Sequence, residues 1–266
     1  MEPHLGFGIP AQPDPLAVGL PVLGAGLESL GYDELWSNDG RLGSGLATLA
    51  AALEATARID LCLGVAPLSD RTADEIAAEV DRLGLPHDRL VLGVGTGSGS
   101  SLAAVRDAMA SLRRSLPDVR LGIAALGPGM CSLGGEIADL VLLNWSFPDR
   151  IAWARERIGA GAHAAGRPVP RVAAYVRVAL GADAAVRLAA EGDRYRARPR
   201  AYSSLFDAQH ADERGVPGIA ATDPADVAAL LAPYRATLDS CVVRALPAEA
   251  DAAGWLAIAE AATLPP

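Results

Sequence analysis

Short, almost wholly apolar runs alternate with longer amphipathic stretches along most of the chain. Runs such as Ile59–Val65, Val119–Ala125 and Ala138–Leu143 are bounded by turn residues. Continuous apolar runs of this length are typical of parallel strands that are covered on both faces. The stretches between them, such as Thr72–Leu83, repeat their apolar positions at helical spacing. The pattern therefore predicts an α/β protein in which helices shield a parallel sheet.

The alternation predicts eight strands and the helices that connect them. We expect strands at residues 5–9, 34–37, 59–65, 89–95, 119–125, 138–143, 171–180 and 241–246. We expect helices at residues 16–30, 46–56, 72–83, 101–116, 130–133, 148–165, 182–209, 224–238 and 248–262. Eight such units in about 250 residues are typical of a (β/α)8 TIM barrel, which we predict as a single domain over residues 1–266. An open, doubly wound sheet is the alternative that the same alternation permits, and the count of eight favours the closed barrel.

Composition excludes several classes of partner. The 266-residue chain has a formal net charge of -9 and contains no lysine, so it has no basic stripe that could collect phosphates. We therefore expect no nucleic-acid partner. No apolar run approaches the length of a membrane span, and the start of the chain lacks the pattern of a signal peptide. The cysteines (Cys62, Cys131 and Cys241) lie far apart in apolar runs, which indicates buried, reduced thiols. We expect a cytoplasmic protein with no membrane partner.

The stretch from Arg89 to Ser101 combines an apolar run with alternating glycines, after which a helical pattern resumes at Leu102. Glycines at the end of a strand let the backbone turn and approach a ligand closely. A serine at position 98, 100 or 101 could cap the following helix, and such a helix start is suited to a phosphate. The stretch lacks the G-x-G-x-x-G spacing and the lysine of a phosphate loop. A tight turn that binds nothing is therefore an equal alternative.

In a TIM barrel the active site lies where the carboxyl ends of the strands meet. Those ends are expected at residues 38–39, 64–66, 95–98, 126–130, 144–145, 175–179 and 244. They include a carboxylate, Asp39, but no histidine, and no zinc spacing or G-x-S-x-G motif is present, so we expect no metal site. Glycine-rich strand ends with few proton-transfer groups predict that a cofactor carries the chemistry. Strand alternation does not decide whether Arg177 points into the barrel, and Arg244 is either an anion contact or part of a surface ion pair.

Taken together, the strand ends resemble the luciferase-like monooxygenase family of flavin- and deazaflavin-dependent oxidoreductases. The motifs that carry the likeness are Leu30–Asp39, Ala55–Ile59, Gly64–Pro67 with Arg71, Arg89–Gly97, Ala124–Met130 with Gly135–Asp139, Leu142–Trp145 and Ala174–Leu180. The last two are most similar to the branch related to methylenetetrahydromethanopterin reductase, which uses the deazaflavin coenzyme F-420. The resemblance implies hydride transfer between this coenzyme, at its C5, and a small organic substrate. It also implies a homodimer.

The resemblance further assigns roles to individual residues. It places Asp39 near the reactive face of the coenzyme, as the catalytic residue. It implies a non-prolyl cis peptide bond between Gly64 and Val65 behind the deazaflavin ring, and a seat for the phosphate-bearing tail at the amides of residues 125–130. The residues expected to bind the cofactor are Gly64, Val65, Ala66, Gly95, Thr96, Gly97, Ser98, Ala125, Leu126, Gly127, Gly129, Met130 and Trp145.

The sequence departs from the family pattern at three places. Gly40 stands where members often carry a histidine after the aspartate, and Ser98 stands where some carry a glutamate. The segment between Thr96 and Val119 is shorter than usual, so an excursion after the fourth strand is trimmed. Two alternatives follow. One is an FMN-dependent monooxygenase on the same barrel, and the other is a non-catalytic flavin-binding member that has lost its activity.

Overall fold

The parallel strands close into a barrel. The computed structural model describes residues 3–40, 43–97, 99, 101–197 and 200–264. Parallel pairing runs in order from β1 to β7, then from β7 to β9 and from β9 back to β1. The eight barrel strands are β1 (His4–Gly8), β2 (Glu34–Ser37), β3 (Asp60–Pro67), β4 (Leu90–Gly95), β5 (Arg120–Ala124), β6 (Leu140–Asn144), β7 (Arg171–Leu180) and β9 (Ser240–Leu246). The predicted closed barrel is confirmed, and the open sheet is excluded.

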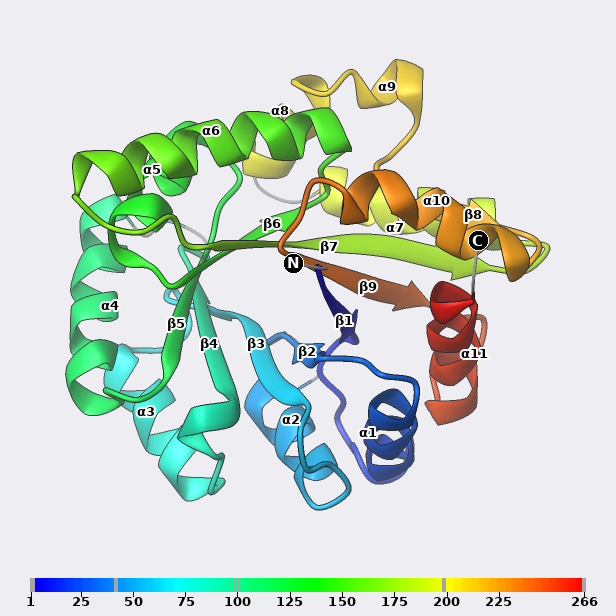
Figure 1. Ribbon diagram of the computed structural model, residues 1–266, viewed down its shortest axis with the longest axis horizontal. Coiled ribbons are helices and arrows are strands. Elements are labelled where there is room, and N and C mark those ends of the chain that lie inside the picture. Colours follow the sequence, from blue (N-terminus) through cyan, green and yellow to red (C-terminus); the bar gives the residue numbers. More distant parts are fainter. Residues whose placement is uncertain (1–2, 41–42, 98, 100, 198–199, 265–266) are drawn as a thin grey trace.

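Helices surround the strands (Figure 1). They are α1 (Leu20–Ser29), α2 (Gly45–Leu53), α3 (Ala73–Arg82), α4 (Leu102–Ser115), α5 (Pro128–Ile137), α6 (Pro148–Ala164), α7 (Ala184–Arg196), α8 (Arg200–Asp207), α9 (Ala211–Arg214), α10 (Ala225–Arg235) and α11 (Ala252–Thr263), with the 3-10 turn η1 at His87–Arg89. No helix in the described part of the chain is both long and apolar enough to cross a membrane.

Local sequence explains where several helices begin. Thr72 and Glu75 form a reciprocal capping box at the start of α3, which satisfies two otherwise unpaired amides. The Ser101 side chain accepts a hydrogen bond from the amide of Ala104 and caps α4, as one of the three candidate serines was expected to do. The chain passes from β4 into α4 through residues 96–101, of which 98 and 100 lie outside the described residues.

The segment between β7 and β9 differs from the expectation. A single helix was predicted over 182–209, whereas the structure has α7 and α8, followed by α9 and a short extra strand, β8 (Ile219–Ala221). The sequence of this stretch contains a proline at position 199, which disfavours a continuous helix because proline supplies no amide. Strand β8 pairs with the last three residues of β7, on the same edge of β7 that pairs with β6 further back. Strand β8 therefore continues the sheet beyond the end of β6 and is not a ninth strand of the closed barrel.

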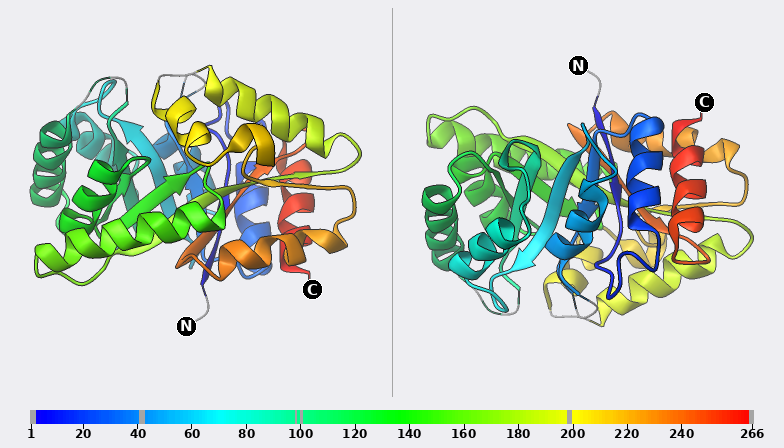
Figure 2. Two further views of the ribbon diagram at one scale, coloured as in Figure 1. Left: turned by 90° about the horizontal axis from the view of Figure 1, so that it is seen from above. Right: turned by 90° about the horizontal axis from the view of Figure 1, so that it is seen from below.

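We call the end of the barrel at which the strands terminate the barrel mouth. The N-terminus and the segment that carries α8 and α9 lie at opposite ends of the barrel (Figure 2). The segment α7–α9 therefore lies at the barrel mouth. The interior below it is filled by side chains that include Trp36, Cys62 and Leu142, so the barrel is a packed core rather than a pore.

Candidate functional site

Small side chains line one half of the barrel mouth, at the ends of β3, β4 and β5. A Cβ atom added at Gly95 would lie 3.0 Å from a Val65 methyl and 3.6 Å from the Ala124 methyl. We call these three residues the small-residue wall. The peptide bond between Gly64 and Val65 is cis, which confirms the expectation from the resemblance. The pairing of β3 with β4 shifts register between Leu63 and Ala66, so the wall includes a bulge.

Two hydrogen bonds hold this bulge from opposite sides. The Tyr175 hydroxyl donates to the carbonyl oxygen of Gly64 at 2.9 Å, and the Asp39 amide donates to the carbonyl oxygen of Val65 at 3.2 Å. A Cβ added at Gly64 would lie 2.7 Å from the Tyr175 oxygen, so Gly64 faces a filled interior. Ala66 is fully buried with the core between strands and helices. Of these residues, Val65 is therefore the one whose side chain belongs to the small-residue wall.

The carboxylate of Asp39, the predicted catalytic group, is hydrogen-bonded to neighbouring residues. It accepts hydrogen bonds from the Gly45 amide at 2.7 Å and from Arg71 at 3.0 Å. Arg71 also bonds Glu79, and both carboxylates raise the pKa of Arg71 against the lowering effect of its burial. Asp39 thereby anchors the start of α2 to the bulge. A direct role for Asp39 towards a substrate stays a prediction.

The glycine-rich stretch after β4 forms a tight turn. Gly97 has φ of +61°, and a Cβ there would lie 2.0 Å from the Ser69 hydroxyl oxygen. Glycine is therefore required by the turn itself. Thr96 is half-buried beside it, and Ser98 lies outside the described residues. The following helix, α4, is capped by its own Ser101, so the structure favours the tight-turn interpretation over a phosphate seat at this helix.

The start of α5 differs, because no side chain caps it. Gly127 is the N-cap residue and Pro128 opens the helix. The amides of Gly129 and Met130 lie in its first turn, where backbone N–H groups have no partner within the helix. A Cβ at Gly127 would meet nothing within 4 Å, so the space before these amides is open. The preceding loop is fixed by Arg150, which donates to the Leu126 carbonyl oxygen at 3.1 Å, and by the Ala125 amide, which donates to Leu142.

Bulky and charged side chains fill the other half of the barrel mouth, at the ends of β6, β7 and β9. Trp145 has φ of +51° and is fully buried against Tyr195 and Phe206. The guanidinium carbon of Arg177 lies 4.0 Å from the centre of the Trp145 ring. Arg177 is 2% exposed and points into the barrel, which answers the question that strand alternation left open. Arg244 is also buried, so it does not form a surface ion pair.

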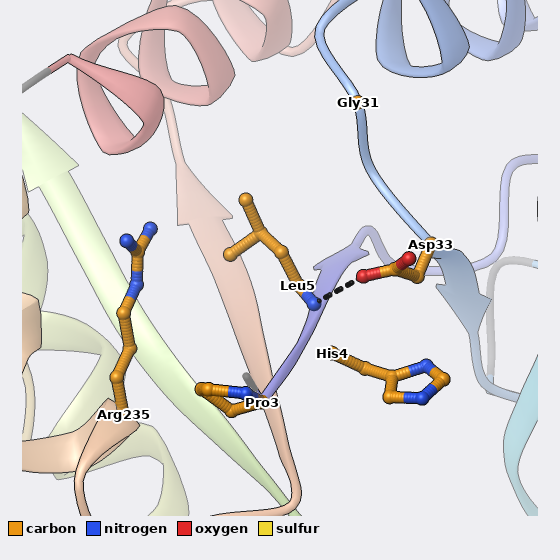
Figure 3. Close-up of a pocket in the computed structure, with 6 residues that line it drawn as sticks. All are labelled: Pro3, His4, Leu5, Gly31, Asp33 and Arg235. Carbon is orange, nitrogen blue, oxygen red and sulfur yellow. Dashed lines mark hydrogen bonds between the residues drawn. The ribbon is translucent and has the colours of Figure 1, made fainter. Parts of the chain in front are cut away.

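A pocket of about 400 Å³ lies at the opposite end of the barrel, lined by Pro3, His4, Leu5, Gly31, Asp33 and Arg235 (Figure 3). The Asp33 carboxylate accepts the Leu5 amide there at 2.8 Å. This end of a TIM barrel serves stability, whereas chemistry takes place at the other end. No group of three or more potential ligands that could hold a metal ion occurs among the residues that the structure describes.

Two features of this site were not found from the sequence. The hydrogen bond from Tyr175 to the Gly64 carbonyl oxygen joins residues 111 positions apart. The hydrogen bond from Arg150 to the Leu126 carbonyl oxygen joins helix α6 to the loop before α5. No local pattern signals either contact. Most predicted cofactor residues do lie at the barrel mouth, in the small-residue wall, the adjoining turn or the start of α5. Trp145 lies across from them, under α7 and α8.

Residues 22–115 match the family described as luciferase-like monooxygenase. A 5,10-methylenetetrahydromethanopterin reductase from Methanolobus tindarius is 28% identical over 217 residues, which cover 67% of this chain and 67% of the relative. Over these residues the chain is similar to the luciferase-like family. Two solved structures share the fold of its eight-stranded barrel.

A coenzyme F420-dependent tetrahydromethanopterin reductase from Methanopyrus kandleri aligns with a TM-score of 0.75 and 19% identity, over 98% of this chain and 97% of that one. The oxygenating constituent of 3,6-diketocamphane monooxygenase from Pseudomonas putida, in complex with FMN, aligns with a TM-score of 0.66 and 15% identity, over 99% and 97% of the two chains. At these identities both comparisons establish the fold.

The residues at the barrel mouth fit the parts of a flavin or deazaflavin. The small-residue wall offers an apolar surface without long side chains, as a planar ring requires. The open space at Gly127 lies before amide donors that carry no side-chain cap, as a phosphate requires. The two features lie at the ends of β3–β5 and directly after β5, so a single molecule can reach both.

Proposed function

We propose that this protein is an oxidoreductase that transfers a hydride between the deazaflavin coenzyme F-420 and a small organic substrate. The observation that carries the proposal is the uncapped start of α5 beside the small-residue wall. The 28% identity to a methylenetetrahydromethanopterin reductase supports it, as does the fold shared with a coenzyme F420-dependent reductase.

When bound, the coenzyme supplies the hydride, and the protein's own residues hold and orient the reacting groups. Val65, Gly95 and Thr96 would hold the ring, and the Gly129 and Met130 amides would hold the phosphate of the tail. Tyr175 and Asp39 would act as positioning residues, because their hydrogen bonds fix the bulge that would support the ring. Positioning of this kind accelerates hydride transfer without an acid or a base in contact with the ring.

Two alternatives remain distinct from this proposal. The shared fold with an FMN-containing monooxygenase supports FMN as the cofactor. The absence of histidine and glutamate at positions 40 and 98 supports a flavin-binding protein without catalysis. In all three cases the partner is a small molecule. The homodimer and the cytoplasmic location also stay predictions.

Titration of the purified protein with coenzyme F-420 and, separately, with FMN tests the proposal through quenching of cofactor fluorescence. We expect saturable binding of F-420 and no binding of FMN. Preferential binding of FMN would support the monooxygenase instead. Failure to bind either cofactor would overturn the assignment of the barrel mouth as a cofactor site.

The variant Gly127→Val tests the tail seat. Gly127 has an extended backbone that valine adopts readily, and the added methyl groups would project into the open space before the α5 amides. We expect F-420 affinity to fall at least tenfold, which corresponds to about 1.4 kcal/mol, with an unchanged thermal midpoint. Gly159→Val is the matched control, because Gly159 also has open space around its Cβ position but lies within α6. Equal losses in both variants would contradict the proposed seat.

A further inference from the structure

Two buried arginines lie side by side at the barrel mouth. Arg177 on β7 and Arg244 on β9 are register partners in adjacent parallel strands. Both are buried, at 2% and 8% exposure, and both guanidinium groups lie near the Tyr175 ring, at 6.0 and 5.1 Å from its centre. We call them the arginine pair. Like charges on directly neighbouring strand positions destabilise a sheet, so this arrangement calls for an explanation.

Neither arginine has a carboxylate partner among the described residues. Arg177 donates to the side-chain oxygen of Asn144, while its Nε has no acceptor in the described part of the chain. Arg244 donates to the carbonyl oxygen of Ile9 and, at 2.7 Å, to the side-chain oxygen of Asn38. All of these acceptors are neutral. They orient the two guanidinium groups without cancelling their charge.

The surrounding groups do not supply the missing negative charge. Burial lowers the pKa of Arg177, Arg244 lowers it further, and Tyr195 and Glu191 oppose this shift. Glu191 is engaged elsewhere, since it forms an ion pair with Arg194. A buried charge is normally paired, because removing it from water costs several kcal/mol.

We propose that the arginine pair is the seat for an anionic oxygen group, a carboxylate or a phosphate, on the substrate. This inference rests on the proposed function, because it takes the barrel mouth to be the active site. A guanidinium donates two parallel hydrogen bonds to either anion. The anion would reach the pair from the side of Arg244, since Trp145 and Tyr195 cover Arg177. The rest of the substrate would then face the small-residue wall, which the proposed function assigns to the ring of the cofactor.

Calorimetric titration of the cofactor-free protein with inorganic phosphate, at ionic strength held constant with sodium chloride, tests this seat. We expect saturable binding that weakens at least tenfold in Arg177→Met and in Arg244→Met. Arg114→Met is the control, because Arg114 is exposed on α4 and its loss changes the net charge equally. If one of the mouth variants does not fold, the other carries the test. Phosphate affinity that is the same in wild type and variants, or no phosphate binding, would overturn the proposal.

A second titration identifies the source of the anion. With coenzyme F-420 present at saturation, we expect phosphate still to bind and still to depend on the arginine pair. Exclusion of phosphate by the coenzyme would assign the seat to the coenzyme's own phosphate and overturn the assignment to the substrate. Phosphate binding that depends on the pair in a protein that fails to bind F-420 would keep the anion seat and reject the proposed cofactor. The two failures are therefore distinguishable.

Discussion

The two ends of the barrel differ in whether their buried charged side chains form ion pairs. Among the described residues, three charged side chains are buried: Glu34, Arg177 and Arg244. At the N-terminal end, Glu34 accepts hydrogen bonds from Trp36 at 2.7 Å and Ser240 at 2.5 Å and forms an ion pair with Arg171. At the barrel mouth, the two arginines have neutral acceptors only. The buried charge is therefore balanced by an opposite charge at the N-terminal end. At the barrel mouth it is not balanced, and there we propose that an anion binds.

Carboxylates also fasten the strands together at the N-terminal end. The side chains of Asp139 and Asp239 accept the amides of Leu121 and Val172, at 2.9 and 2.8 Å. Each of these aspartates precedes a barrel strand and thereby fixes the start of a neighbouring strand. This difference is the one expected if the N-terminal end serves stability and the barrel mouth binds the ligand that we propose.

The largest effect that tests this comparison is expected from Glu34→Gln. The variant leaves Arg171 without its charge partner and weakens the bonds to Trp36 and Ser240. Glu34 is fully buried whereas Arg171 is 30% exposed, so water can still reach the arginine. We expect the free energy of unfolding to fall by about 2 kcal/mol, which urea denaturation at neutral pH measures. Glu156→Gln is the control, because Glu156 is 77% exposed and its loss changes stability by less than about 0.5 kcal/mol. If Glu34→Gln were as stable as the control, the buried ion pair would not stabilise the N-terminal end, and the proposed difference between the two ends would be contradicted.

Arg177→Met at the barrel mouth should behave differently. Removing a buried charge that has no counter-ion is favourable, and this gain offsets the lost bond to Asn144 and the lost stacking on Trp145. We expect the free energy of unfolding to change by less than about 1 kcal/mol. A loss as large as that of Glu34→Gln would identify Arg177 as a structural cation. The same urea experiment decides this question.

The barrel was predictable because its signal is repeated along the chain. Each of eight apolar runs ends in turn residues, and the count alone separates a closed barrel from an open sheet. Strand β8 escaped the prediction because three residues are too few to show a pattern. The division of the 182–209 helix was also missed, although Pro199 was there to suggest it.

The candidate site was only partly predictable, for a physical reason. Alternation along β7 places Tyr175 and Arg177 on one face, but both faces of a barrel strand are buried, so the sequence lacks the polar contrast that would show which face points inward. The partners of Asp39 include Arg71, 32 residues away. Contacts of this kind depend on how loops from different strands meet, which local spacing does not encode.

The smallest expected effect concerns acid sensitivity at the N-terminal end. Burial by itself would raise the pKa of Glu28, but hydrogen bonds from the amides of residues 57–59 outweigh it and bring the pKa below the usual 4.5. A carboxylate with a lowered pKa stabilises the folded state fully above the unfolded value, and this contribution is lost as the pH falls through the folded value. Because Glu28 remains largely accessible to water, we expect Glu28→Gln to lower the free energy of unfolding by about 0.5 kcal/mol at pH 7. The difference from wild type should shrink below pH 4.5 in urea titrations, and a difference that grew with acid would contradict the assigned role of these amide bonds.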